Sequence, residues 1–326
     1  MEVQIHKDLK THNTYLLLHQ LLLKQSATMS DLVKSTGLSQ SSVRNMLRDL
    51  EIRGVIKDIG VDHSTGGRCP NRFILDAQKI RTLNIYVHHR SAEYCFMNLY
   101  EEVYKGVFNY NSYQELENWI INQTREYVVC CITLAVEGVV DGYIYYTDHK
   151  NEYIRNDWID HLKNTLDIPV YVENDVKAIQ RGFYSSDESL SYFTFLYINE
   201  VGMACSTMKD GNILSGEKGI LGELGLIPYQ DKTINQFLRE CNDQKEYENM
   251  ILYLCTIICV SLDPQKIVLA DDTQWNIDID LLDEKLYPIV HSHYDITRIE
   301  NVQTYLFNGL NALAIHNNLL KISEER

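Results

Sequence analysis

Residues 30–54, SDLVKSTGLSQSSVRNMLRDLEIRG, have the pattern of two short helices joined by a glycine turn. Ser30 is expected to cap the first helix, and Gly37 provides the left-handed residue that ends it. Ser39 is expected to cap the second helix, whose apolar residues recur at helical spacing and form one face. Those residues are Val43, Met46, Leu47 and Leu50. The pattern predicts a helix-turn-helix, a motif that presents its second helix to the major groove of DNA.

The opposite face of the second helix is polar. Short hydroxyl and amide side chains at its N-terminal end are followed by guanidinium groups, a set that can contact base edges and phosphates. The candidate DNA-contacting residues on this helix are Ser39, Gln40, Ser41, Ser42, Arg44, Asn45 and Arg48. The alternative is a plain helical hairpin with a polar outer face. The neighbouring segments favour DNA binding over that alternative.

Those neighbouring segments complete a winged helix. A leucine-rich helix over residues 14–24 precedes the pair, and two predicted strands, 55–59 and 71–75, follow it around a polar loop. In this loop Gly67 and Arg68 place a guanidinium on a slim backbone, a shape suited to a narrow A·T-rich minor groove. The alternative for Arg68 is an incidental surface arginine. If Arg68 enters the groove, Arg68→Ala weakens binding most at A·T-rich flanks.

Composition and charge indicate how this head relates to the rest of the chain. With 326 residues, 45% of them hydrophobic, the chain is long enough for two or three folded domains. No apolar run has the length of a membrane span and no secretory signal is present, so the expected compartment is the cytoplasm. Residues 1–80 contain 11 Lys and Arg against 8 Asp and Glu, and the remainder contains 19 against 37. A basic head on an acidic body is typical of a protein that contacts nucleic acid at one end.

Beyond the wing, the predicted elements are those of an α/β body. Three successive strands are predicted over 83–87, 92–97 and 103–108, and a helix over 113–125. Residues 127–135 form a continuous apolar run, which predicts a central strand covered by helices on both faces. Strands and helices alternate after this run, as in α/β folds.

Four sequence motifs occur in order along the chain. They are GGRCP in the wing, IPVYVENDVKAI at 168–179, GILGELGLI at 219–227 and LDPQKIVLADD at 262–272. These resemble GGRPP, LPVFVENDANAA, GLAGEIGHI and LNPEVIVLGGG of the ROK family (repressor, open reading frame, kinase), in its winged-helix repressor branch. The resemblance covers nearly the whole chain. It implies an α/β fold with a winged helix-turn-helix over 1–78 and a two-lobed, actin-like (sugar-kinase or ribonuclease-H-like) body over 79–326, for effector binding, dimerisation or both.

The loops that hold nucleotide in the family's kinases are altered in this chain. Their D-x-G-G-T phosphate loop corresponds to residues 86–90, YVHHR, which contain neither glycine nor acid. Their second phosphate loop is reduced to residues 200–205, EVGMAC. Their G-G near the adenosine has become Asp271-Asp272, an acidic pair that would repel a polyphosphate. The resemblance therefore implies no catalytic residues, no enzymatic activity and no cofactor.

The family's zinc site is also missing from the sequence. Leu226 stands where the family has a histidine, and only Cys241 remains of the family's C-x-C-G-x-x-G-C run. A tetrahedral zinc needs four ligands. The pairs His88-His89 and His291-x-His293 have no acidic or thiol partner at ligand spacing and are more typical of surface or core histidines, so no metal site is predicted.

The residue types of a sugar pocket are retained. In the family's kinases the aspartate of the END motif acts as base on a sugar hydroxyl, while the asparagine and the GE-x-G glutamate bind hydroxyls. By this resemblance Asn174, Asp175 and Glu223 are the candidate sugar-binding residues. The alternative is that residues 173–175 only cap a helix that begins at Val176.

Together these features predict a sequence-specific transcription regulator, a repressor of carbohydrate-related genes whose kinase-like body is inactive. The expected partners are a double-stranded DNA operator, a sugar or sugar phosphate effector, and a second copy of the chain, because half-site geometry favours dimers. Two alternatives stay open. One is a bifunctional ATP-dependent sugar kinase that uses Asp175, and the other is a dimer that binds DNA without an effector.

Overall fold

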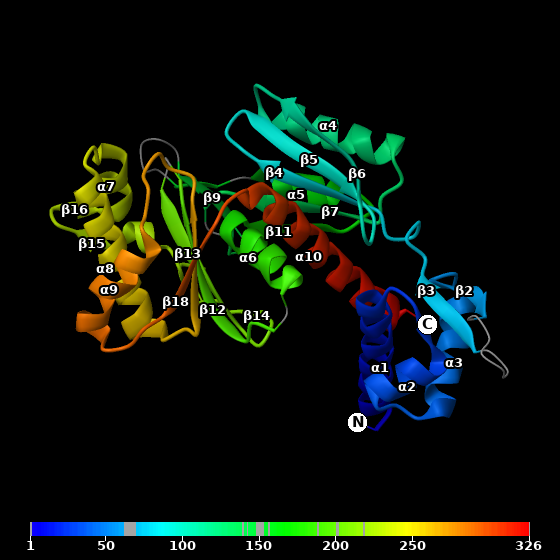
Figure 1. Cartoon of the computed structure of the whole chain (residues 1–326). Helices are drawn as coiled ribbons and strands as arrows, with labels where there is room; N and C mark the ends of the chain where they lie inside the picture. Colours follow the sequence, from blue (N-terminus) through cyan, green and yellow to red (C-terminus); the bar gives the residue numbers. More distant parts are fainter. Residues whose placement is uncertain are drawn as a thin grey trace.

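Figure 1 shows a small head built from the N-terminal residues and a larger body of two lobes, with both chain termini at the head. The computed structural model describes residues 2–61, 70–138, 140–141, 143–147, 153–155, 157–187, 189–199, 202–217 and 219–325. None of the helices in these ranges is both long and apolar enough to span a bilayer.

The head consists of three helices and a β-hairpin. Its elements are α1 (Glu2–Lys24), β1 (Ala27–Thr28), α2 (Met29–Thr36), α3 (Gln40–Ile52), β2 (Ile56–Val61) and β3 (Asn71–Leu75). β2 and β3 pair antiparallel, as expected for a wing. β1 pairs with β3 as a third strand, which the sequence did not indicate because two residues are too few to show a pattern. The first helix extends well beyond the predicted 14–24.

The turn between α2 and α3 has the predicted glycine, but the start of α2 differs from the prediction. Gly37 ends α2 with a φ of 69°, and the Ser39 side chain caps α3. The cap of α2 is Thr28 rather than Ser30, so that prediction was wrong. Thr28 and Asp31 form a capping box, in which two backbone amides are satisfied reciprocally, whereas a lone serine would satisfy one.

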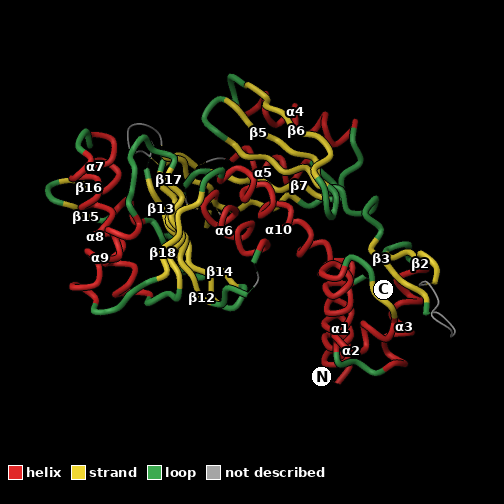
Figure 2. The backbone as a smooth tube through the Cα atoms, viewed as in Figure 1, coloured by secondary structure: helices red, strands yellow, loops and turns green. Residues whose placement is uncertain are grey.

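The first lobe is a five-stranded sheet with helices on both faces (Figure 2). Its strands, in sheet order, are β11 (Val170–Asn174), β7 (Cys131–Val136), β4 (Thr82–Val87), β5 (Ser91–Met97) and β6 (Glu102–Asn109). One face is covered by α4 (Tyr113–Glu126) and α5 (Asp157–Thr165), the other by α6 (Asp175–Ser186) and α10 (Val302–Glu324). Between β7 and α5 in the sequence, the chain forms a small sheet of β8 (Val140–Asp141), β9 (Tyr143–Thr147) and β10 (Tyr153–Arg155).

The central strand β7 is buried along its whole length, which confirms a strand covered on both faces. It begins later than its apolar sequence suggests. Tyr127 and Val128, at the start of the predicted range, are exposed and outside the strand. Tyr127 instead ends α4, where its amide donates to the carbonyl of Gln123. Hydropathy alone did not separate this connection from the strand.

The second lobe repeats the strand order of the first. Its sheet consists of β14 (Asn212–Ile213), β13 (Met203–Lys209), β12 (Tyr192–Ile198), β17 (Lys266–Asp271) and β18 (Asp295–Ile299). Numbered along the chain within each lobe, both sheets have the order 3-2-1-4-5. In both, the first three strands are antiparallel neighbours and the last two join in parallel. This duplicated arrangement is the predicted actin-like, ribonuclease-H-like body.

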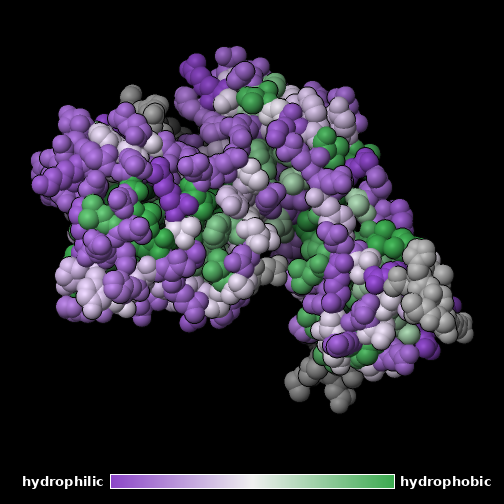
Figure 3. Space-filling model, in the orientation of Figure 1, coloured by the Kyte–Doolittle hydropathy of each residue, from purple (hydrophilic) through white to green (hydrophobic). Residues whose placement is uncertain are grey.

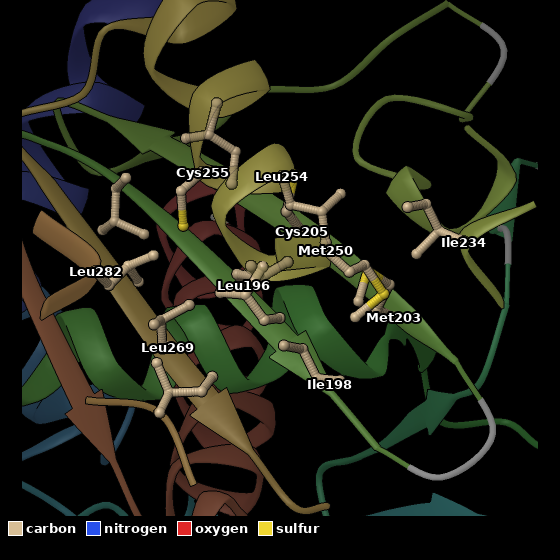
Figure 4. Close-up of a cluster of buried hydrophobic side chains, with 14 of the residues drawn as sticks. Leu196, Ile198, Met203, Cys205, Ile234, Met250, Leu254, Cys255, Leu269 and Leu282 are labelled. Atoms are coloured by element: carbon tan, nitrogen blue, oxygen red, sulfur yellow. The ribbon is translucent and has the colours of Figure 1, made fainter. Parts of the chain in front are cut away.

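Helices and short strands cover the outer face of the second sheet. They are η1 (Leu224–Leu226), β15 (Pro228–Tyr229), β16 (Lys232–Thr233), α7 (Ile234–Glu240), α8 (Gln244–Leu262) and α9 (Ile279–Val290). Figure 4 shows the apolar core that they enclose, in which Leu196 and Leu269 of the sheet lie in one cluster with Met250 and Leu254 of α8.

Each lobe ends in a helix, and these two helices, α6 and α10, pack against each other through glycines. A Cβ on Gly182 would lie 1.8 Å from the carbonyl oxygen of Tyr305. A Cβ on Gly309 would lie 1.8 Å from the carbonyl oxygen of Ala178. The backbones therefore approach more closely than any other residue type would allow.

α10 continues past this crossing into the head (Figure 1). Ile315 and Leu319 pack in the same apolar cluster as the buried residues of α1, α2 and α3. At the end of α3, Arg53 donates a 2.6 Å hydrogen bond to the carbonyl of Ile322. One helix thus belongs both to the body and to the core of the head.

Candidate nucleic-acid interface and interlobe site

α3, the second helix of the helix-turn-helix, presents a polar face to solvent. Val43, Met46, Leu47 and Leu50 are buried on the opposite side, as predicted. The exposed side chains are Ser39, Gln40, Ser41, Ser42, Arg44, Asn45 and Arg48. Arg44, Asn45 and Arg48 form no hydrogen bond or ion pair with any residue that the structure describes. Their donors are therefore available to an external partner.

The serines at the start of α3 have local partners as well. The Ser39 Oγ accepts a hydrogen bond from the backbone amide of Ser42. It also lies 2.8 Å from the Ser42 Oγ and 3.0 Å from the Ser41 Oγ. Ser39 is therefore first of all a helix cap, and a contact to DNA would use the remaining capacity of these hydroxyls.

Polar contacts join both strands of the hairpin to adjacent loop residues of the head. Lys57 of β2 forms a 2.8 Å ion pair with Asp76, and Arg72 of β3 donates to the Ser26 Oγ at 2.8 Å. The predicted contact residues Gly67 and Arg68 lie outside the described residues.

Asp175, the first residue of α6, lies near the junction of the two lobes and is only 5% exposed. Its Oδ1 accepts a hydrogen bond from the amide of Val176, and its Oδ2 accepts one from the hydroxyl of Tyr86 at 3.4 Å. Burial, and then the charge of Glu137, raise the pKa of Asp175 to about 7. A carboxyl group with such a pKa is suited to exchange a proton near neutral pH.

Asn174 caps α6. Its Oδ1 accepts a hydrogen bond from the amide of Lys177, and its Nδ2 donates to the carbonyl of Gly138 at 2.9 Å. Asn174 thus caps the helix, and a contact to a sugar would use the remaining hydrogen-bonding capacity of its amide. The helix begins at Asp175, one residue earlier than expected.

His88 lies where the resemblance to kinases places a phosphate loop. Its Nε2 is 3.2 Å from a carboxylate oxygen of Glu93, and its Nδ1 is 3.4 Å from one of Glu137. Burial opposes protonation, but hydrogen bonds to Glu137 and then Glu93 raise the pKa of His88 to about 9. Sequence spacing showed no acidic partner for His88, but the fold brings it two, Glu93 from β5 and Glu137 from the end of β7.

Glu223 shares the electrostatic environment of Asp175. Burial raises the pKa of Glu223 against the opposing charge of Lys177. The charge of Glu223 in turn contributes to the raised pKa of Asp175 and, after burial, to that of Cys205. The candidate sugar-binding residues Asp175 and Glu223 thus come from the two different lobes, and the charge of Glu223 acts on Asp175.

The acidic pair at the end of β17 is engaged by tyrosine hydroxyls. Tyr247 donates to Asp271 and Tyr197 donates to Asp272, each at 3.0 Å. The charge of Asp272 and then that of Asp175 add to the effect of burial in raising the pKa of Tyr197. These contacts join the end of the second sheet to the surroundings of Asp175.

The segment that corresponds to the family's zinc loop does not offer a ligand set. Leu226 is 41% exposed at the end of η1, and the Cys241 Sγ lies 3.5 Å from the carbonyl oxygen of Asp243. Within the described ranges, no three His, Cys, Asp or Glu side chains are arranged to hold a metal ion.

The fold defines the class of this protein: a winged-helix head on a duplicated, ribonuclease-H-like body. Residues 114–251 match the ROK family. The chain therefore carries a ROK family domain, as its motifs predicted.

Two relatives show how far the sequence similarity extends. The xylose repressor of Bacillus subtilis is 22% identical over 249 residues, covering 69% of this chain and 62% of the relative. The DNA-binding transcriptional dual regulator NagC of Escherichia coli is 20% identical over 215 residues, covering 60% of this chain and 52% of the relative. The chain thus spans less than two thirds of the length of these curated relatives.

Solved structures show the same fold. A ROK family transcriptional regulator, described as a homolog of the E. coli MLC protein, matches with a TM-score of 0.74 and 15% identity over 97% of this chain and 99% of its own. A ROK hexokinase from Thermus thermophilus matches with a TM-score of 0.53 and 14% identity over 72% of this chain and 98% of its own. At these identities the likeness establishes the fold alone.

Proposed function

We propose that this chain is a sequence-specific DNA-binding transcription regulator that represses carbohydrate-related genes. The observation that carries the proposal is the exposed face of α3, where Arg44, Asn45 and Arg48 have no partner among the described residues while the other face is fixed in the head. Helices of this kind read base edges in the major groove. The names of the similar repressors, for xylose and N-acetylglucosamine, support a link to carbohydrates.

A mobility-shift titration with DNA from upstream of the chain's own operon tests this function. We expect saturable binding that persists against an excess of unrelated duplex and weakens as salt rises, because phosphate contacts release counterions. The unrelated duplex at matched length and salt is the control. Folded protein that binds both duplexes equally, or neither at low salt, would contradict the proposal.

We propose that the body does not transfer phosphate. In support, His88 and its two glutamates lie where a phosphate loop would need free backbone amides. One observation favours the alternative of a bifunctional kinase, namely that Asp175 has a pKa of about 7, suited to a general base. A coupled ATP assay over a panel of hexoses decides. Turnover that Asp175→Asn removes would establish the kinase, and no turnover would exclude it.

We propose that Asn174, Asp175 and Glu223 contribute to a site for a sugar or sugar phosphate effector. Carboxylates and amides suit vicinal hydroxyls, and the charge of Glu223 contributes to the raised pKa of Asp175. A ligand that binds only the native state raises the melting temperature. A thermal-shift screen of sugars and sugar phosphates, repeated with Glu223→Gln, tests the site. If no compound stabilises the protein, the alternative of DNA binding without an effector is favoured.

We propose that the chain acts on DNA as a homodimer. Two heads related by a two-fold axis would contact half-sites about one helical turn of DNA apart. Sedimentation velocity of the free chain and of its DNA complex measures the stoichiometry. One chain per operator would exclude the dimer.

A further inference from the structure

A cavity of about 420 Å³ lies where the head, the first lobe and the two crossing helices meet. α1 contributes Tyr15 and His19, and the turn after β5 contributes Tyr100. α10 contributes Asn311 and Ala312, while the C-terminal end of α6 closes the remaining side. Figure 3 shows hydrophobic side chains gathered where the head joins the body. The cavity shares no residue with the surroundings of Asp175.

The side chains that line this cavity include no carboxylate, ammonium or guanidinium group. This contrasts with the whole chain, in which 23% of residues are charged and the net charge is −15. Aliphatic and aromatic groups predominate, and the polar groups are hydroxyls, amides and two imidazoles. Burial, followed by the charges of Arg181 and His19, lowers the pKa of His316, which favours the neutral form of this ring. Walls of this kind favour a neutral ligand over an ion.

One wall is an aromatic cluster that joins the head to the body. The ring of Tyr15 stacks on that of His19, with centroids 5.8 Å apart and an angle of 17° between planes. It meets the ring of His316 edge-on at 5.5 Å, and the Tyr15 hydroxyl is 2.8 Å from the His316 Nδ1. A flat ring can pack against such a cluster, and the imidazoles and hydroxyl can exchange a hydrogen bond with it.

We propose that this cavity is a binding site for a small, neutral aromatic molecule with one hydrogen-bonding group, of the kind represented by phenol and indole. Its volume lies within the range of small-molecule sites, roughly 300–1,000 Å³. Ile315 and Leu319 line it and also pack in the core of the head, so the ligand contacts both sides of the junction. A molecule that binds only this docked arrangement fixes the head against the body.

Calorimetric titration and thermal shift of the full chain with indole and with phenol test the site. We expect saturable binding at one site and a rise in melting temperature. Ala312→Leu and Ser186→Phe fill the cavity from α10 and from α6, and each is expected to weaken indole binding at least about tenfold. His12→Ala removes an exposed imidazole of α1 outside the cavity and serves as the matched control.

Circular dichroism of both filling variants shows whether they fold, and either folded variant suffices. Intermolecular NOEs from indole to the rings of His19 and His316 provide a check that needs no variant. The proposal is overturned if neither probe binds saturably to the wild type, or if indole binds elsewhere by the NOE test. It is also overturned if a folded filling variant binds indole as the wild type does. If a filling variant changes the sedimentation coefficient and leaves indole binding unchanged, the proposal is overturned and the cavity is assigned to a contact between two copies of the chain.

Discussion

Arg48 projects from the exposed face of α3, one turn beyond Arg44, and neither guanidinium is held by a described residue of the chain. If Arg48 contacts the operator, Arg48→Ala should weaken binding by about 1–3 kcal/mol for a base contact. For a phosphate contact, the loss should be uniform across sequences and the salt slope should fall by about one. Mobility-shift titrations at several salt concentrations measure both. Arg125→Ala, an exposed arginine of α4, is the control, and equal effects of the two substitutions would contradict the role of Arg48.

The raised pKa of Asp175 makes the stability of the native state depend on pH. The ordinary pKa of an aspartate is 3.8, and the native value is about 7. Between these values the unfolded chain releases a proton that native Asp175 retains, so the free energy of unfolding falls as pH rises from about 4 to 7. Above pH 7 this decrease in the free energy of unfolding is complete, and it amounts to at most about 4 kcal/mol.

Asparagine cannot ionise, so Asp175→Asn should remove this fall and become more stable relative to the wild type as pH rises. Urea unfolding at pH 4.5, 6 and 8 measures the difference. Asp160→Asn, at an exposed position of α5, should leave the pH profile unchanged. Parallel profiles for the wild type and Asp175→Asn would show that the native pKa is not raised.

Single residues were predictable where their role depends on neighbours in sequence. Gly37, Ser39 and the buried face of α3 are fixed by helix geometry, and the structure has them as predicted. The surroundings of His88 were not predictable, since Glu93 reaches it from β5 and Glu137 from the residue that follows β7. The cap of α2 was missed for a different reason, because Thr28 and Ser30 are both good caps and only the partner Asp31 distinguishes them.

The crossing of α6 and α10 is the element contact most sensitive to side-chain size. In Gly309→Ala the new Cβ would meet the carbonyl oxygen of Ala178, which is backbone and cannot turn away. The helices must separate, and we expect a loss of about 1–3 kcal/mol in the free energy of unfolding. Urea unfolding compares this variant with Thr304→Ala, at an exposed position of the same helix. If Gly309→Ala were as stable as Thr304→Ala, the close approach would be disproved.

Elements with a long periodic pattern were predicted, and those defined by their neighbours were not. The helices of the head and the wing strands followed from spacing. β1 is a strand only because it pairs with β3. The last turn of α9 contains Pro288, a residue that in a sequence argues against a helix. The boundaries of the head and body, 1–78 and 79–326, remain predictions, because α10 contributes to both.

At the scale of the whole molecule, the repeated strand order of the two lobes cannot be read from the sequence, since it is a property of topology and not of residue identity. The distribution of charge, in contrast, can be read from the sequence. The head projects from the body (Figure 1), and the sequence gives the head a net positive and the body a net negative charge, so the net charge of the body opposes the approach of a duplex. Composition therefore predicts the end at which nucleic acid approaches, whereas the helix that connects the head to the lobes could be found only in the structure.

That connection predicts that head and body unfold together. α10 packs in the core between the sheets of the two lobes through Leu306 and Leu310, and in the core of the head through Ile315 and Leu319. All three tryptophans of the chain belong to the body, so tryptophan fluorescence reports on the body alone. Leu32→Ala truncates a fully buried side chain of the head and should cost about 2–5 kcal/mol. We expect it to lower the fluorescence midpoint as much as the midpoint seen by circular dichroism.

Ile52→Ala is the matched control, because Ile52 is 76% exposed on α3 and its truncation should leave both midpoints unchanged. A fluorescence midpoint that stays fixed while circular dichroism shows an earlier loss of helix would mean that the head unfolds alone. In that case α10 would be a tether and not a shared structural element. Coincident midpoints would instead show that α10 couples the stability of the head to that of the lobes. Through such coupling, an effector that changes the packing of α10 in the body would also change the free energy of the head and so influence DNA binding.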